Sequence, residues 1–290
     1  MAVSKPSIVS VETGPSRNLE PADLASLRTA FERLEHESYT ARLTNMVGKQ
    51  IELATALIPE KVRSVAENAT GMALKAAMKV ALRSLDPAKP PRASSAGLHK
   101  SLATASGAAG GALGLAALPF ELTVSTTLIL RSIADIARAE GEDINDPQTA
   151  LACMEVFAMG GRTEVDDHLR SSYFAVRALL AKSITEASKY MLHRKVADET
   201  APVVVKLIAQ IAARFGVAVS QKAVAQAVPI LGAIGGAAVN YAFIEHFQSI
   251  ARGHFAVRRL ERIYGEDFIR IEYERLKTED DDRAAKAKVI

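Results

Sequence analysis

Hydrophobic residues recur at intervals of three and four along most of the chain, and this spacing predicts helices. Leu24, Leu27, Phe31 and Leu34 form one such apolar face, with charged residues around the rest of the helix. The same spacing begins again after prolines 21, 59, 147 and 202. A proline is tolerated in the first turn of a helix, where its missing N–H has no partner to lose. Because alanine is abundant and β-branched runs are scarce, the pattern predicts an all-α protein.

Two stretches depart from this amphipathic pattern because they carry no charge. Residues 101–120 form a run of 20 and residues 223–244 a run of 22, each long enough to cross a bilayer as a helix. Pro229 and Asn240 count against a plain membrane span in the second run. Glycines four apart place small residues on one helical stripe, which lets two backbones approach closely. We therefore expect a multi-helix bundle around two close-packed Gly/Ala-rich helices, with these packing positions: Gly107, Gly110, Gly111, Gly114, Gly232, Gly235 and Gly236.

The predicted organisation is a single helical domain over residues 18–276, with flexible termini. Residues 1–17 lack the continuous apolar region of a signal peptide and predict a disordered lead. A Pro/Ser segment at 86–95 predicts a linker, since consecutive prolines cannot continue a helix. The charged residues 277–290 predict a flexible tail. Within the predicted domain, helices are expected to end at Gly141, Gly216 and Gly265.

Three ionisable residues lie in the apolar sequence that follows the first uncharged run. Arg131 and Asp135 are one helical turn apart and can pair, and Glu121 lies close to three turns earlier. Charges in such a setting are costly unless they are paired. The trio is therefore interpreted first as an ion-pair network that holds helix register. The alternative is a catalytic site in which Glu121, Arg131 and Asp135 act with Asn240 or His246.

The charge distribution suggests a surface for lipid or for a partner. Between residues 60 and 100, eight Lys and Arg stand against three acids, although the whole chain carries only +3. Basic clusters beside an apolar segment can contact anionic head groups, whereas the small total charge and 5% aromatic content argue against nucleic-acid binding. The candidate lipid or partner surface comprises Lys75, Lys79, Arg83, Lys89, Arg92, Arg258, Arg259 and Arg262.

No motif for a cofactor or a metal is found in the sequence. The glycines at 107–114 neither follow a strand pattern nor precede Lys-Ser/Thr, and GxSxG, HExxH and CxxC are absent. Glu164 and His168 are four apart but lack further ligands for a metal site. The single cysteine, Cys153, lies among apolar neighbours and is expected to be a buried core residue. We expect no cofactor and no metal.

Two glycine-rich blocks carry a resemblance to a known family. The sequence GGALGLAALPFELTVSTTLILRSIADIARAEGEDINDPQTALACMEVFAMGG, followed later by PILGAIGGAAVNYAFIEHFQSIARGHFAVRRLERIYG, resembles the EcsC family of bacterial proteins. This family takes its name from a protein encoded beside the components of an ABC transporter, and it has no established activity. The resemblance implies a helical domain with a connection to transport or membranes. It also implies structural roles for Gly111, Gly114, Pro119, Glu121, Arg131, Asp135, Gly141, Gly161, Gly232, Gly236, Asn240 and Gly265.

Three functions fit these observations. The first is a non-enzymatic helical protein at the cytoplasmic face of the membrane, in contact with lipid or a membrane protein such as an ABC transporter. The second is a hydrolase that uses the carboxylate/Arg cluster. The third is a soluble scaffold whose Gly/Ala blocks are completely covered by the amphipathic helices at 21–85 and 164–215. The two uncharged runs and the basic block beside one of them motivate the first hypothesis, which is preferred mainly because of the family resemblance.

Overall fold

The all-α fold is confirmed by the structure, a computed structural model, in which the described residues contain helices and no strand. The described residues are 18–36, 39, 42–43, 59–84, 114–161, 173–194, 200–227 and 232–287. The helices are α1 (Pro21–Glu35), α4 (Glu60–Ser84), the short 3-10 helix η1 (Gly114–Ala117), α6 (Leu118–Ala139), α7 (Pro147–Met159), α9 (Tyr173–Arg194), α10 (Pro202–Ala227), α11 (Gly232–Tyr264) and α12 (Glu266–Ala287).

Several helix ends follow the local signals in the sequence. Pro21, Pro147 and Pro202 each begin a helix, and α4 begins directly after Pro59. The Asp146 side chain caps α7 by accepting a hydrogen bond from the Gln148 N–H at 3.1 Å. Two glycines at helix ends adopt a left-handed backbone, Gly141 with φ +83° and Gly265 with φ +97°. The predicted stops at these two glycines are confirmed.

The structure differs from other expectations about where helices begin and end. Gly216 does not break α10, which continues to Ala227. The uncharged run 223–244 is not one helix, since it is divided between the end of α10 and the start of α11. The predicted charged tail is helical as far as Ala287, where ion pairs such as Arg275–Glu279 support α12.

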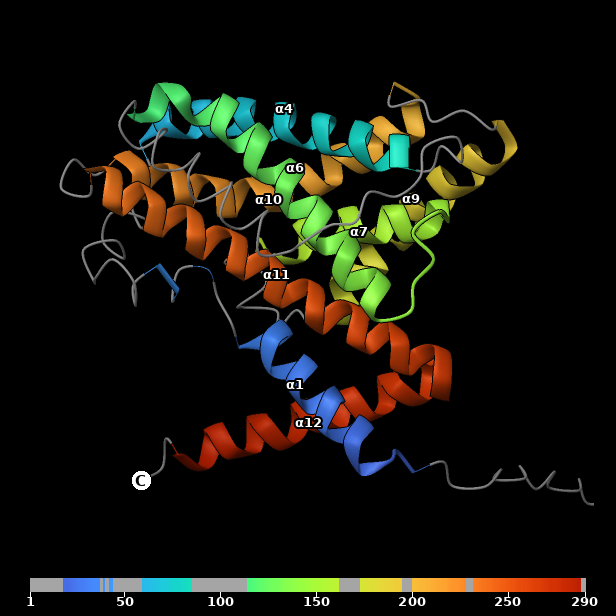
Figure 1. Cartoon of the computed structure of the whole chain (residues 1–290). Coiled ribbons are helices and arrows are strands. Elements are labelled where there is room, and N and C mark those ends of the chain that lie inside the picture. Colours follow the sequence, from blue (N-terminus) through green and yellow to red (C-terminus); the bar gives the residue numbers. More distant parts are fainter. Residues whose placement is uncertain are drawn as a thin grey trace, which may run out of the picture.

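The long helix α11 runs diagonally through the molecule (Figure 1). On one side of it, α4 packs on α6 and α10, and α6 packs on α11. The helices α7 and α9 pack on each other and on α10. On the other side, α1 lies across α11, and α12 crosses beneath α1 after the sharp turn at Gly265. This arrangement creates two separate hydrophobic clusters.

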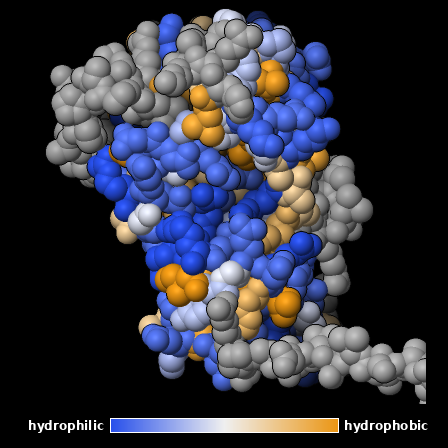
Figure 2. Space-filling view, turned by 90° about the vertical axis from the view of Figure 1, so that its right-hand side faces the viewer, coloured by the Kyte–Doolittle hydropathy of each residue, from blue (hydrophilic) through white to orange (hydrophobic). Residues whose placement is uncertain are grey.

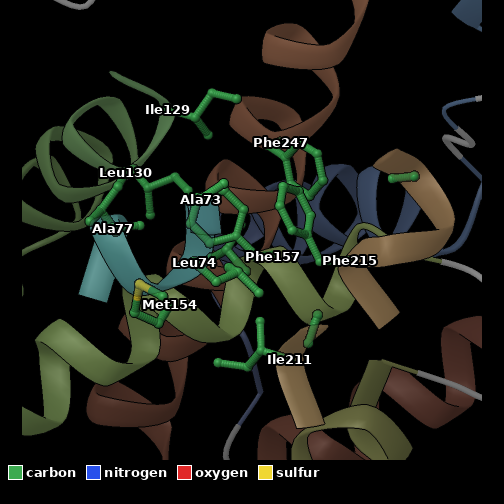
Figure 3. Close-up of a cluster of buried hydrophobic side chains, with 14 of the residues drawn as sticks. Ala73, Leu74, Ala77, Ile129, Leu130, Met154, Phe157, Ile211, Phe215 and Phe247 are labelled. Atoms are coloured by element: carbon green, nitrogen blue, oxygen red, sulfur yellow. The ribbon is translucent and has the colours of Figure 1, made fainter. Parts of the chain in front are cut away.

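The larger cluster joins α4, α6, α7, α10 and α11 (Figure 3). Its centre holds Phe157, Phe215 and Phe247, whose ring centroids are 5.0 to 5.5 Å apart. A side chain at Gly160 would overlap the Phe247 ring, so this glycine is required by close approach. Cys153 is buried in the same cluster as predicted, and burial raises the pKa of its thiol to about 12.

The smaller cluster contains the buried side chains of α1, α12 and the last turns of α11, together with Tyr173 at the start of α9. Tyr273 of α12 is one of the largest fully buried side chains of the described residues. The cluster therefore attaches α12 to the rest of the protein.

The predicted packing of the two Gly/Ala blocks stays a prediction. Gly107, Gly110 and Gly111 lie outside the described residues, as do the linker at 86–95 and the lead at 1–17. Gly114 begins η1, and Gly232, Gly235 and Gly236 lie in the first turns of α11.

Candidate functional site

A fully buried lysine lies at the centre of a polar cluster inside the larger hydrophobic core. Lys222 of α10 donates one hydrogen bond to Glu121 Oε1 at 2.9 Å and another to Asn240 Oδ1 at 2.8 Å. Gln226, one turn after Lys222, donates to the other carboxylate oxygen of Glu121 at 3.3 Å. Lys222 is 0% exposed and Glu121 3%, so this is a buried ion pair with neutral hydrogen-bond partners. We call these four residues the lysine cluster.

Three helices position the lysine cluster. Glu121 lies in the first turn of α6, where the helix dipole favours a negative charge. Lys222 and Gln226 are four residues apart on α10 and therefore face the same carboxylate. Asn240 extends from α11. The cluster thus links α6, α10 and α11 at one point.

Burial controls the electrostatics of the cluster. Burial lowers the pKa of Lys222, whereas the charge and hydrogen bond of Glu121 oppose this shift. The Lys222 ammonium also lies 4.5 Å from the centroid of the Phe243 ring, which adds a cation–π contact. Burial, with a contribution from the Glu121 charge, raises the pKa of Tyr39 well above 10. The Tyr39 hydroxyl has no hydrogen-bond partner among the described residues.

The structure brings together two of the predicted site residues and separates the others. Glu121 and Asn240 meet through Lys222. Arg131, by contrast, is exposed. Asp135 is half-buried and faces Arg138 at 3.8 Å, so the predicted Arg131–Asp135 pair is wrong. Ten residues also place Glu121 and Arg131 about 80° apart around the helix, so the three charged residues do not share one face.

His246, the other candidate for the catalytic alternative, lies away from this cluster's hydrogen bonds. Its Nε2 is 2.9 Å from the Gly160 carbonyl oxygen, and its ring contacts Tyr39 and Phe247. A buried histidine with these contacts connects α11 to the end of α7.

The three arginines assigned to the C-terminal part of the lipid or partner surface are engaged inside the protein. Arg258 pairs with Glu142 at 2.8 Å, and Arg262 pairs with the same carboxylate. Arg259 pairs with Glu140 at 3.0 Å and with an acid of α1 at 3.1 Å. These contacts hold the α6–α7 turn and α1 against α11, and the role of these arginines in binding lipid or a partner stays a prediction.

The rest of the predicted basic surface lies on and after α4. Lys75 and Lys79 are exposed on this helix. The side chain of Arg83, and both Lys89 and Arg92, lie outside the described residues.

A second buried polar network was not predicted from the sequence. The Tyr173 hydroxyl is 2.8 Å from His254 Nδ1, and Arg177 pairs with Glu261 and donates to the same hydroxyl at 3.3 Å. Nearby, Glu155 of α7 is 4% exposed, and burial raises the pKa of its carboxyl group to about 7. The only signal in the sequence was an acid within an otherwise apolar helix, in ALACMEVFAM.

Both networks are buried and connect helices distant in the sequence. Among the described residues, no group of three or more His, Cys, Asp or Glu could hold a metal ion. The lysine cluster can hold the register of α6, α10 and α11, because each helix would leave an unsatisfied group if it moved. This arrangement defines an all-helical protein with a closed polar centre.

The comparisons with known proteins define the family. The model of the EcsC protein family matches residues 18–260. This match covers most of the chain, and the protein belongs to the EcsC family. Neither the curated proteins nor the solved structures contain a match.

Proposed function

We propose that this protein is a non-enzymatic helical protein that attaches to the cytoplasmic face of a membrane, beside transport proteins, through α9 and α10. The observation that carries this proposal is the charge of these two helices. Their sequences contain seven Lys and Arg and one acid, Glu186. Such an excess favours contact with anionic lipid head groups.

Three of these cations are used inside the protein, and three of the others have exposed side chains. Arg177 pairs with Glu261, Lys222 pairs with Glu121, and Arg214 donates to a backbone carbonyl of α7. Lys182, Lys189 and Lys206 have exposed side chains. The outer surface of the α9–α10 pair is therefore basic.

Exposed apolar side chains accompany these lysines. Leu179 and Leu192 of α9 are each 58% exposed, and Val205 of α10 is 47% exposed. Leu192 lies near the end of α9 and Val205 near the start of α10, so both lie where this antiparallel pair of helices is connected. We call the four residues Lys189, Leu192, Val205 and Lys206 the hairpin tip.

The end of α9 and the start of α10 lie at the upper right of Figure 1, and the right-hand side of that view faces the reader in Figure 2. In the upper part of that face, hydrophobic side chains stand apart from one another on a largely hydrophilic surface. Lysines beside exposed leucine and valine side chains give the ends of α9 and α10 the residue types of a segment that lies in the head-group region. Each lysine near an anionic surface contributes about 1 kcal/mol, so several are needed for stable attachment.

The apolar residues and the buried charge of α10 favour binding of this helix to the membrane surface over crossing of the membrane. Among the described residues, α10 is the one helix long and apolar enough to cross a membrane, over 202–226, and 39% of its most apolar window is buried in the protein. The same helix carries Lys222 within the lysine cluster. A spanning α10 would have to carry this charge through the bilayer, which is costly.

Co-sedimentation with vesicles tests the proposal. The wild-type chain is expected to sediment with vesicles of 30% phosphatidylglycerol in phosphatidylcholine and to stay in solution with pure phosphatidylcholine. Lys189→Gln/Lys206→Gln removes the two lysines of the hairpin tip and about 2 kcal/mol, so the partition coefficient of this variant should fall roughly 30-fold. Ile271→Ser, which removes a side chain 66% exposed on α12, is the matched control and should leave binding unchanged.

Two results would contradict the proposal. One is a wild-type chain that stays in solution with the anionic vesicles at low salt. The other is binding that falls equally in the lysine variant and in Ile271→Ser, because the attachment surface would then lie elsewhere.

A further inference from the structure

The C-terminal helix α12 covers a surface formed by other parts of the protein. It packs on α11 and α1. The part of the chain that matches the family model ends at residue 260, within α11. Almost all residues of the covered surface belong to this matched part, whereas α12 follows it.

Three buried side chains attach α12 to this surface. Ile269, Tyr273 and Leu276 have relative exposures of 0%, 0% and 3%. They follow the spacing i, i+4, i+7, which is typical of an amphipathic helix bound to an apolar surface of another protein. Most of the remaining α12 side chains are polar or charged. The helix therefore has one apolar face that binds the surface and polar side chains around the rest, as helices that bind in the groove of a partner protein do.

The covered surface is complementary to these anchors. The Tyr273 ring contacts Phe31 and Phe174, with ring centroids 5.2 Å apart in both cases. The Tyr273 hydroxyl donates to Glu35 Oε1 at 3.0 Å. The buried residues of the smaller hydrophobic cluster that do not belong to α12 form the surface on which this helix packs. We call them the helix-docking surface: Leu27, Ala30, Phe31, Tyr173, Ala256, Val257 and Leu260.

Charges beside the apolar anchors are complementary as well. Arg28 of α1 and His36, which directly follows α1, face Glu279 and Asp280 of α12, at 3.7 Å and 3.1 Å. The docked helix therefore carries acids in the turn that follows its last anchor, opposite basic groups of α1. This pattern also sets the orientation of the helix on the surface.

The helix-docking surface is held together by contacts that do not involve α12. Leu34 of α1 packs so closely on Gly253 that a Cβ atom there would lie 2.8 Å from its Cγ. Arg259 and Tyr264 of α11 bind Asp23 of α1 at 3.1 Å and 2.8 Å. The α1–α11 pair should therefore persist when α12 detaches.

The connection to α12 is a single residue. Gly265 separates α11 from α12 with φ +97°, and no atom lies within 4 Å of a Cβ built on it. Glycine tolerates other backbone conformations, so α12 can swing away without strain at this residue.

We propose that the helix-docking surface binds an amphipathic helix of a partner protein and that α12 is a built-in competitor for this surface. The partner helix carries aliphatic and aromatic anchors at i, i+4, i+7, with acidic residues in the following turn. Regulation follows from competition, because a tethered helix is present at a high effective concentration and must be displaced.

A peptide with the sequence of residues 266–287, labelled with fluorescein, serves as the probe for the full-length chain. Ile269→Ser/Tyr273→Ser weakens α12 on its own surface, and this variant should bind the peptide at least tenfold more tightly than the wild-type chain. A peptide with Tyr273→Ser is the matched control for the aromatic anchor. A peptide with Glu279→Lys/Asp280→Lys tests the charge pattern, and both altered peptides should bind at least tenfold more weakly.

Hydrogen exchange of the wild-type chain provides a test that does not depend on a variant. The α12 amides should exchange together through an opening that is more frequent than the opening of α11. The proposal is overturned if α12 exchanges only with the whole protein. It is also overturned if the folded double variant binds the peptide no more tightly than the wild-type chain.

Discussion

Glu155 offers the sharpest test of the buried polar networks. Its side chain is 4% exposed within α7. Burial raises the pKa of its carboxyl group from 4.5 to about 7, with Arg177 and Arg258 opposing the shift and Glu261 adding to it. Replacement by glutamine keeps the shape of the side chain and removes the titration.

The sign of the pH dependence follows from this shift. Because the folded pKa lies above the unfolded one, the folded state binds more protons between pH 4.5 and 7, and stability falls as the pH rises through this window. A shift from 4.5 to about 7 corresponds to about 3 kcal/mol, most of which develops between pH 5 and pH 8. Glu155→Gln should therefore gain about 2–3 kcal/mol relative to the wild-type chain across this interval.

Urea unfolding followed by circular dichroism measures this difference at several pH values. Glu67→Gln, which removes an exposed acid from α4, is the control for loss of one negative charge. Its stability relative to the wild-type chain should change little with pH. If the difference between Glu155→Gln and the wild-type chain is the same at pH 5 and pH 8, the buried carboxyl group is not protonated in the folded state and the reasoning is refuted.

Three further predictions concern packing and charge. Lys222→Met leaves Glu121 buried without its cation and should cost about 3–5 kcal/mol in urea unfolding, whereas adding Glu121→Leu to it should recover much of this loss. Gly161→Ala directs a methyl group into a backbone carbonyl of α10 and should lower the thermal midpoint, whereas Gly216→Ala within α10, whose Cβ would lie 4.0 Å from Thr70 Oγ1, should raise it. Burial lowers the pKa of His254 well below 6.5, so below pH 6.5 His254→Gln should gain up to about 1.4 kcal/mol of stability per pH unit relative to the wild-type chain.

Local signals in the sequence predicted the helical class and many helix ends. Pro147 after Asp146, and the glycines at 141 and 265, act through backbone geometry that neighbouring residues determine. Gly216 was misinterpreted because its cost in a helix, about 1 kcal/mol, is smaller than the gain from packing a long apolar helix such as α10.

Partners distant in the sequence were harder to predict. Glu121 and Asn240 stood out because they interrupt apolar runs, yet the lysine that joins them did not, since Lys222 resembles an ordinary surface residue in SQKAV. Likewise, the positive charge of Arg258 suggests membrane binding in the sequence, whereas in the structure Arg258 is bound to Glu142, 116 residues earlier. The type of a side chain shows which interactions it can form. Which residue it interacts with depends on tertiary packing and cannot be predicted from neighbouring residues in the sequence.

The central claim is that the hairpin tip enters the head-group region of an anionic membrane. Leu192→Cys can be labelled with an environment-sensitive fluorophore, because the single native cysteine, Cys153, is buried. Addition of vesicles with 30% phosphatidylglycerol should shift the emission to shorter wavelength at position 192 and leave a label at Ile271→Cys unchanged. An unchanged emission at position 192 with vesicle-bound protein would contradict the claim.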